Sequence, residues 1–152
     1  MLGFISYSHH DSEQFTALKK QLKPLADAKL LNAWHDQKIL AGDSWDEEIQ
    51  KNLAASAIIL LCVSPDFLWS DYINSVELDH AMERHRSGSA RIIPVIFKDC
   101  LWGSIPFLAA LQAVPRDGKP VQDWKPQNKG MADAARRIQS AVKAMANGKA
   151  AP

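Results

Sequence analysis

The strongest constraint on the fold is an unbroken apolar run at residues 57–63, Ala-Ile-Ile-Leu-Leu-Cys-Val. A strand that faces water on one side alternates apolar and polar residues, whereas this run is apolar on both faces. Such a strand belongs to a parallel sheet that helices cover on both sides. The run is also far shorter than the ~20 residues that a membrane-spanning helix needs, so we expect no transmembrane helix.

Strand-like and helix-like segments alternate along the rest of the chain. Further short apolar runs predict strands at residues 2–7, 30–34 and 91–97, and a weaker one at 121–124. Apolar residues at helical spacing predict helices over residues 12–25, 45–53, 74–86 and 131–145. Asn147-Gly148 should stop the last helix. The alternation predicts an α/β fold: a doubly wound parallel sheet of four or five strands with helices on both faces.

Local patterns refine the positions of these elements. Pro94 cannot donate a hydrogen bond to a neighbouring strand, so its strand should lie at or beside a sheet edge, or be bulged there. Ser44-Trp45-Asp46-Glu47 is a capping box that should open the second helix, with Trp45 on the apolar stripe of that helix. Asp11-Ser12-Glu13-Gln14 resembles such a box and should open the first.

Length, charge and cysteine content exclude several classes of protein. The 152 residues suit one domain, which we expect over residues 1–147, with 148–152 as the start of a linker or tail. The 18 basic and 17 acidic side chains give a net charge of +1 and no basic footprint for nucleic acid. Two cysteines are too few for a disulfide framework, and Cys62 reads as a buried thiol. With no signal segment at the start, we expect a cytoplasmic protein.

Ligands of such sheets bind in the crevice at the carboxyl ends of the strands. The loops to search are therefore residues 8–10, 35–43, 64–70 and 98–104. His9-His10-Asp11 suggests a metal site, but no second ligand cluster accompanies it. Asp36 or Asp99 could be a phosphoacceptor, but no acidic cluster for Mg²⁺ follows the first strand. A glycine-rich phosphate loop and a nucleophile elbow are both absent from the sequence.

Glu77 is the carboxylate whose position most requires an explanation. On a helix it lies beside the apolar Ile73 and Ala81 rather than on a fully solvated face. It could complete a capping box by accepting a hydrogen bond from the amide of Asn74, or it could be catalytic. The two roles are compatible, because a carboxylate in the first turn of this helix also points at the crevice.

Five motifs follow one another along residues 4–124. They are Phe4-Ile5-Ser6-Tyr7-Ser8-His9; Trp34-His35-Asp36 with Ile39, Ala41-Gly42-Asp43 and Trp45; Ser64-Pro65-Asp66-Phe67-Leu68 with Ser70, Tyr72 and Glu77-Leu78; Ile92-Ile93-Pro94-Val95 with Cys100 and Trp102; and Pro106-Phe107 through Leu111-Gln112-Ala113 and Asp117-Gly118-Lys119-Pro120 to Trp124. In this order and spacing they resemble the successive boxes of a Toll/interleukin-1 receptor (TIR) domain of the bacterial type. The resemblance implies a flavodoxin-like parallel sheet of five strands, in which residues 35–43 form the so-called BB loop.

The resemblance also implies a chemistry. Many bacterial and plant TIR domains cleave the bond between nicotinamide and ribose in NAD⁺ with a single glutamate, and Glu77 stands at the matching position. Nicotinamide leaves as a neutral pyridine, so no general acid is required, and the transition state is oxocarbenium-like. The implied substrate-binding residues are Tyr7, Ser8, His9, Asp36, Leu40, Gly42, Trp45, Tyr72 and Ile73. NAD⁺ would be the substrate, with no cofactor and no metal, and ADP-ribose or a cyclised isomer the product.

The implied partners are other TIR domains and a regulator. In this family the BB loop mediates self-association and gates the site, and Ile39 and Leu40 place two aliphatic side chains in it. A homo-oligomer or filament would then be the active form, switched on by a sensor outside these residues, in bacterial anti-phage defence or cell-death signalling. The alternative is a TIR domain that only recruits other TIR domains without turnover. Neither nucleic acid nor a membrane is an expected partner.

Overall fold

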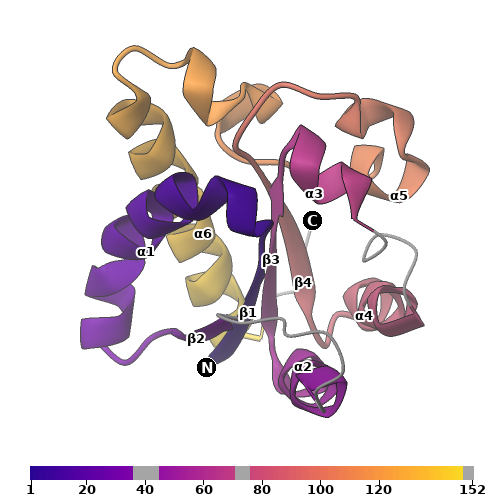
Figure 1. Cartoon of the computed structure of the whole chain (residues 1–152). Coiled ribbons are helices and arrows are strands. Elements are labelled where there is room, and N and C mark those ends of the chain that lie inside the picture. The colour runs from indigo at the N-terminus through magenta and orange to yellow at the C-terminus, as the bar shows by residue number, and fades with distance from the viewer. Residues whose placement is uncertain (36–44, 71–75, 149–152) are drawn as a thin grey trace.

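The computed structural model describes residues 1–35, 45–70 and 76–148, apart from the side chains of residues 45, 46, 76 and 77. Within that part, four strands form one parallel sheet in the order β2-β1-β3-β4 (Figure 1). The strands are β1 (Leu2–Ser6), β2 (Asn32–His35), β3 (Ile58–Val63) and β4 (Arg91–Ile96). The chain moves outward from β1 to β2 and then, on the other side, from β3 to β4. The strand order therefore reverses between β1 and β3, which is where a ligand crevice is expected.

Helices cover both faces of the sheet, as the sequence predicts. The helix α1 (Ser12–Asp27) packs with α6 (Gln127–Ala146) on one face, and α2 (Trp45–Ala55) packs with α4 (Val76–Ser87) on the other (Figure 1). No described helix is both long and apolar enough to cross a membrane. The connections hold shorter elements: α3 (Pro65–Trp69), α5 (Pro106–Ala109), and the 3-10 helices η1 (His9–Asp11), η3 (Trp102–Ser104), η4 (Arg116–Gly118) and η5 (Val121–Asp123).

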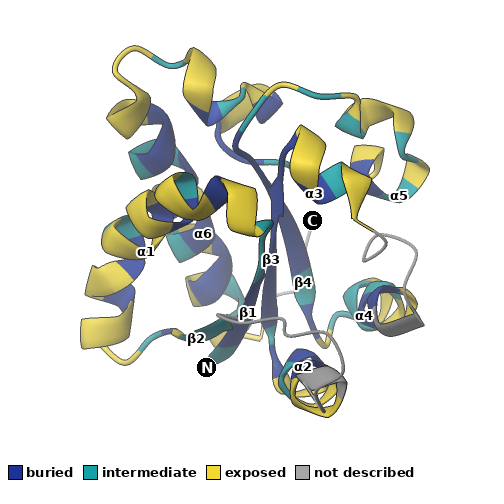
Figure 2. Ribbon diagram, in the orientation of Figure 1, coloured by how far each residue is buried: buried dark blue, intermediate teal, exposed yellow. Residues whose placement is uncertain are grey.

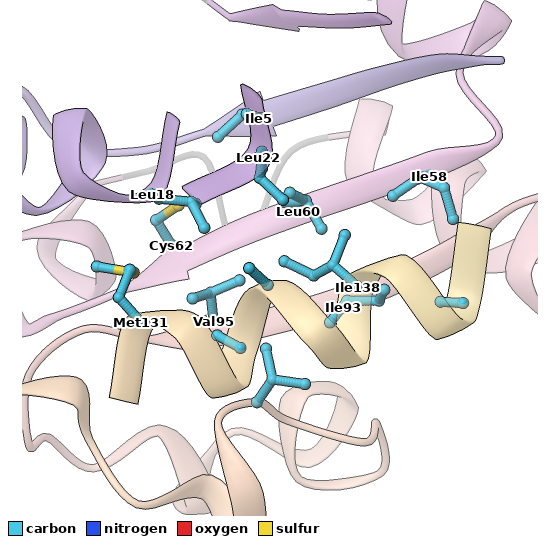
Figure 3. Close-up of a cluster of buried hydrophobic side chains, with 14 of the residues drawn as sticks. Ile5, Leu18, Leu22, Ile58, Leu60, Cys62, Ile93, Val95, Met131 and Ile138 are labelled. Atoms are coloured by element: carbon cyan, nitrogen blue, oxygen red, sulfur yellow. The ribbon is translucent and has the colours of Figure 1, made fainter. Parts of the chain in front are cut away.

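The buried core divides into two layers because alternate residues of each strand face opposite sides. Along β3, Ile58, Leu60 and Cys62 belong to the cluster under α1 and α6, which Figure 3 shows in close-up. Ile59, Leu61 and Val63 belong to the cluster under α2 and α4. All six β3 residues are buried, which confirms the prediction made from the apolar run (Figure 2). Each buried side chain of this size contributes roughly 1.5–3 kcal/mol.

Cys62 is a buried, free thiol, as predicted. Burial, and secondarily the nearby Asp11 carboxylate, raise the pKa of this thiol well above its usual value. The group therefore stays protonated and behaves as a small apolar side chain of the core.

The helix predictions hold within a few residues at the ends. Phe15, Leu18, Leu22 and Leu25 of α1 are buried, as are Ile49 and Leu53 of α2. The last helix ends at Ala146, and Gly148 follows with a φ of 71° and donates its N–H to the Met145 carbonyl, so the predicted stop is confirmed.

The prediction of a strand at residues 121–124 is wrong, because Val121–Asp123 form η5. In the described part, the sheet continues beyond β4 only through one parallel bridge between Val95 and Val114. The Val114 N–H donates to the Pro94 carbonyl and the Val114 carbonyl accepts from Ile96, both at 2.8 Å. The next N–H on that side, from Arg116, donates to Asp133 Oδ2 at 2.7 Å instead, so the ladder ends there. A fifth strand, which the resemblance implied, is therefore reduced to a single residue.

The outer edge of β4 offers no free N–H group along its described length. Arg91 and Phe97 donate inward to the carbonyls of Ala57 and Val63, so the N–H groups of the even-numbered residues point outward. Ile92 donates to His85 Nδ1 at 3.1 Å, and Ile96 to Val114. Pro94, between them, has no N–H to satisfy. The predicted edge position of Pro94 is confirmed, and the proline leaves no unpaired donor there.

His85 must be neutral to accept the Ile92 N–H, and its surroundings keep it so. Burial, followed by the charges of Arg91 and Arg86, lowers the pKa of His85 below its usual value. The unfolded chain therefore takes up a proton at higher pH than the folded chain. The contribution of His85 to stability is fully present above about pH 6.5 and is lost as the pH falls toward the lower folded pKa.

We predict that His85→Ala lowers the free energy of unfolding by about 1 kcal/mol at pH 7.5, because the Ile92 N–H loses its acceptor. The variant should also lose stability less steeply than the parent below pH 6.5. Urea unfolding at a series of pH values measures both effects. His80→Ala is the matched control, since His80 lies on the same helix with 73% of its side chain exposed. Parallel pH profiles for the parent and His85→Ala would contradict the prediction.

Candidate functional site

The candidate site lies where three neighbouring strands end. Tyr7, Ser8 and His9 follow β1, Ser64 follows β3, and Lys98 comes shortly after β4. The carboxyl ends of parallel strands share one edge of the sheet, so these side chains come from loops that meet there.

A buried carboxylate joins these loops. Asp11, at the end of η1, has no exposed surface. Its Oδ2 accepts a hydrogen bond from the Ser64 hydroxyl, and its Oδ1 lies 2.8 Å from Lys98 Nζ. The Ser64 hydroxyl in turn accepts the N–H of Phe67 at 3.1 Å and so caps α3. One carboxylate therefore ties together the segments that follow β1, β3 and β4.

The prediction that Asp11 opens α1 in a capping box is wrong. It occupies the cap position, but its side chain makes no capping hydrogen bond to the helix. The physical reason is its burial: an ionised carboxylate removed from water needs a charged or hydrogen-bonded partner, and Lys98 and Ser64 supply both. Ser8 acts as the local cap instead, because its hydroxyl accepts the His10 N–H at 3.3 Å and starts η1.

The charge of Lys98 is stabilised by its surroundings. The hydrogen bond to Asp11 raises the pKa of Lys98, burial opposes this, and the charges of Asp11, Asp66 and Glu13 raise it further. A raised lysine pKa means that the ion pair persists through neutral pH and is lost only as the pH rises through the folded pKa. Lys98 is 28% exposed and forms the solvent side of the pair.

Aromatic rings fix the ends of β1 and β2. The rings of Tyr7 and Phe15 stack with centroids 3.8 Å apart and planes 7° apart. His35, the last residue of β2, meets the Phe15 ring edge-on at 4.8 Å, and His9 lies 5.8 Å from Tyr7. Tyr7 is therefore held between α1 and two adjacent strand ends, with part of its surface exposed.

The structure brings together some of the predicted site residues and leaves the others untested. Tyr7, Ser8 and His9 lie together at the end of β1, half-buried or exposed. Glu77 is the second residue of α4 and Trp45 the first of α2; these helices pack against each other, but the two side chains lie outside the described part. Residues 36–44 and 71–75, which include Asp36, Leu40, Gly42, Tyr72, Ile73 and Asn74, also lie outside it.

Within the described residues, no group of three or more His, Cys, Asp or Glu side chains could hold a metal ion. In the His9-His10-Asp11 segment, both oxygens of the Asp11 carboxylate are engaged by Ser64 and Lys98. Asp11 therefore serves the structure rather than a metal. Two sequence features indicate this network when they are taken together: a serine directly after β3 and a lysine directly after the apolar run that contains β4.

These features define a doubly wound parallel α/β domain with a crevice at its strand ends. The family model described as the TIR domain matches residues 4–132. The chain therefore belongs to the TIR domain family, in its bacterial form. It is 41% identical over 139 residues to an uncharacterized protein, y4lF, of Sinorhizobium fredii, covering 91% of this chain and 43% of that protein. The chain thus spans less than half the length of this relative.

We predict that Lys98→Met costs about 3 kcal/mol of unfolding free energy, because it leaves the Asp11 carboxylate buried without a counter-charge. Adding Asp11→Asn should restore part of the loss, since the amide keeps an oxygen for Ser64 and carries no charge. Urea unfolding of both variants measures the effect. Lys23→Met is the control: its pair with Asp27 is exposed and should contribute no more than about 1 kcal/mol. Equal losses of unfolding free energy for Lys98→Met and Lys23→Met would contradict the prediction that the buried Asp11 carboxylate depends on the charge of Lys98.

Proposed function

We propose that this TIR domain is an NAD⁺ nucleosidase, a hydrolase of N-glycosyl bonds that separates nicotinamide from ribose. The observation that carries the proposal is the match to the TIR domain over residues 4–132 together with a glutamate, Glu77, at the second position of α4. The product is ADP-ribose, or a cyclised isomer if a nucleophile of the substrate itself reaches the sugar before water does.

Glu77 is the proposed catalytic carboxylate. The positive charge of the pyridinium passes to the sugar as nicotinamide leaves neutral, so the transition state is oxocarbenium-like. A carboxylate hydrogen-bonded to the ribose hydroxyls would orient the sugar and stabilise charge at the anomeric carbon. Asp11 does not compete for this role, because it is fully buried and paired with Lys98.

Three of the proposed substrate contacts lie at the crevice. Tyr7, Ser8 and His9 come from the end of β1, where the Tyr7–Phe15 stack and the Ser8–His10 hydrogen bond hold the backbone in place. The remaining proposed contacts are Asp36, Leu40, Gly42, Trp45, Tyr72 and Ile73. NAD⁺ enters as the substrate, and the proposal requires no further cofactor or metal.

We predict that Glu77→Gln keeps the fold and lowers nicotinamide release by about 100-fold or more, because the neutral amide cannot stabilise the developing charge. Chromatographic detection of nicotinamide from concentrated protein and NAD⁺ measures the rate, with circular dichroism to match folding. Glu83→Gln is the control on the same helix, since its side chain is 73% exposed. Glu77→Ala is a poorer test because it could also cost roughly 0.5–2 kcal/mol of helix capping. Equal release by Glu77→Gln and the parent would dispose of the catalytic assignment.

A second candidate function is a TIR scaffold that binds other TIR domains without turnover. Two exposed apolar side chains are available for such contacts: Trp69 of α3 is 90% exposed and Leu101, before η3, is 78% exposed. Large exposed apolar side chains often mark protein contacts when they form a patch. The nicotinamide assay separates the two functions, since a scaffold binds TIR domains and releases none.

We propose further that the enzyme is a cytoplasmic effector in anti-phage defence or cell-death signalling, activated when a sensor outside these residues clusters it. TIR domains commonly self-associate. In the y4lF protein the matched residues form 43% of the length, so in that relative a TIR domain is joined to more chain. Tethering raises the effective concentration to roughly millimolar without any new contact.

We predict that specific activity rises with protein concentration, because each copy completes or releases the site of a neighbour through the BB loop, residues 35–43. Leu40→Asp should lower both the assembly size and the rate. Light scattering and nicotinamide release over a hundredfold concentration range test this, and fusion to an inducible oligomerisation module should mimic the effect at low concentration. Flat specific activity in both experiments would refute activation by assembly. Trp69→Ser is a useful comparison, since it alters an exposed apolar side chain outside that loop.

A further inference from the structure

A pocket of about 380 Å³ lies beside β4, on the side away from β3. Its lining includes Arg91, Trp102, Gln112, Asp117 and Arg137. Arg91 is the first residue of β4, so the pocket reaches the amino end of this strand, whereas the candidate crevice lies beyond the carboxyl ends. The volume is within the ~300–1,000 Å³ that small-molecule pockets have. In the described part the sheet continues past β4 only at Val114, so no strand lies beside the first half of β4, where the His85 ring meets the Ile92 N–H.

Two arginines line this pocket, and both have guanidinium donors without a partner among the described residues. Arg91 is half-buried, its guanidinium makes no hydrogen bond or ion pair with the described residues, and burial lowers its pKa. Arg137 donates from Nε to Asp133 Oδ2 at 2.9 Å, while its terminal amino groups have no partner among the described residues. A half-buried cation without a counter-charge is costly, and a pair of guanidinium groups is well suited to the oxygens of a phosphate.

The lining also includes a carboxylate and an aromatic ring. Asp117 and Gly118 both have left-handed backbone, with φ of 62° and 69°. Gly118 is required there for a second reason, because a Cβ would lie 2.8 Å from the Trp102 ring. The Trp102 indole is half-buried and lines the pocket together with Asp117. A carboxylate beside two cations repels a simple anion but accepts hydrogen bonds from the hydroxyls of a sugar.

We propose that this pocket binds a nucleoside 5′-monophosphate. The phosphate lies between Arg91 and Arg137, the ribose hydroxyls donate to Asp117, and the base packs against Trp102. An acidic side chain that accepts from ribose hydroxyls and basic groups that hold the phosphate form a common division of roles in nucleotide sites. None of the residues placed in the crevice or proposed to bind NAD⁺ lines this pocket, and Trp102 alone comes from one of the strand-end loops, so AMP binding is expected to be independent of the proposed NAD⁺ cleavage.

Calorimetric titration of the full chain with AMP tests the proposal. We expect saturable binding that weakens as NaCl is added, because charges carry the phosphate contact. Arg91→Gln and Arg137→Gln should each weaken AMP binding by about tenfold or more. Arg136→Gln is the matched control: it removes the same charge one position earlier on α6, from an exposed residue that does not line the pocket, and should bind as the parent does.

Two further titrations separate this site from simpler explanations. Asp117→Asn should weaken binding of AMP but not of inorganic phosphate, which has no ribose. Glu77→Gln should bind AMP as the parent does, since Glu77 belongs to the proposed crevice. The proposal is overturned if AMP gives no binding up to about 10 mM, or if Arg91→Gln binds as tightly as Arg136→Gln. It is equally overturned if inorganic phosphate binds as tightly as AMP, or if Glu77→Gln abolishes AMP binding.

Discussion

The buried carboxylate of Asp11 links segments of the chain that follow three different strands. Its two oxygens engage Ser64, which follows β3, and Lys98, which follows β4, while Asp11 itself ends the short helix after β1. The ends of β3 and β4 also share backbone hydrogen bonds from Phe97 and Lys98 to Val63, but the segment after β1 is tied to them through Asp11. Ser64 in addition caps α3. The Ser64 cap therefore holds the start of α3 in place. The Asp11 contacts likewise hold the end of η1, which follows the loop that carries Tyr7, Ser8 and His9. The geometry of the crevice depends on this one charge being buried and compensated.

The sheet and its two helical layers were predictable because their signal is local and repeated. The run at residues 57–63 is apolar on both faces, and the stripe Phe15, Leu18, Leu22, Leu25 repeats at helical spacing. The strand at 121–124 was predicted wrongly because a short stretch that begins with a buried apolar residue suggests a strand. Val121 instead reaches the core from η5, where the N–H groups of Asp123 and Trp124 bond back to Pro120 and Val121. The pattern of apolar residues indicates which residues are buried, but not which backbone groups they pair with.

The site was less predictable because its contacts are long-range. Asp11 fits a capping box when only its neighbours in sequence are considered, yet its serine partner is 53 residues away. Tyr7, Ser8 and His9 lie together at the end of β1, which a strand followed by a polar turn already suggests, while the roles of Glu77 and the rest of the implied set stay predictions. The pocket beside β4 gave no readable signal, because Arg91 and Arg137 are ordinary surface residues in sequence and become neighbours only through the fold. The Asp117-Gly118 pair, a common left-handed turn, was the one local hint.

The donor-free edge of β4 has a consequence for solubility at high local concentration. Family members commonly self-associate, and a crowded sheet protein with an open strand edge risks adding strands from neighbouring copies without limit. Along β4 the outward positions offer no free N–H group for such pairing. The Ile92 N–H is bonded to His85, Pro94 has no N–H, and the Ile96 N–H is bonded to Val114. Neighbouring copies that meet this face must therefore pack side chain against side chain. Side-chain contacts between copies can dissociate on dilution, whereas a continuous ladder of hydrogen bonds between their strands would persist.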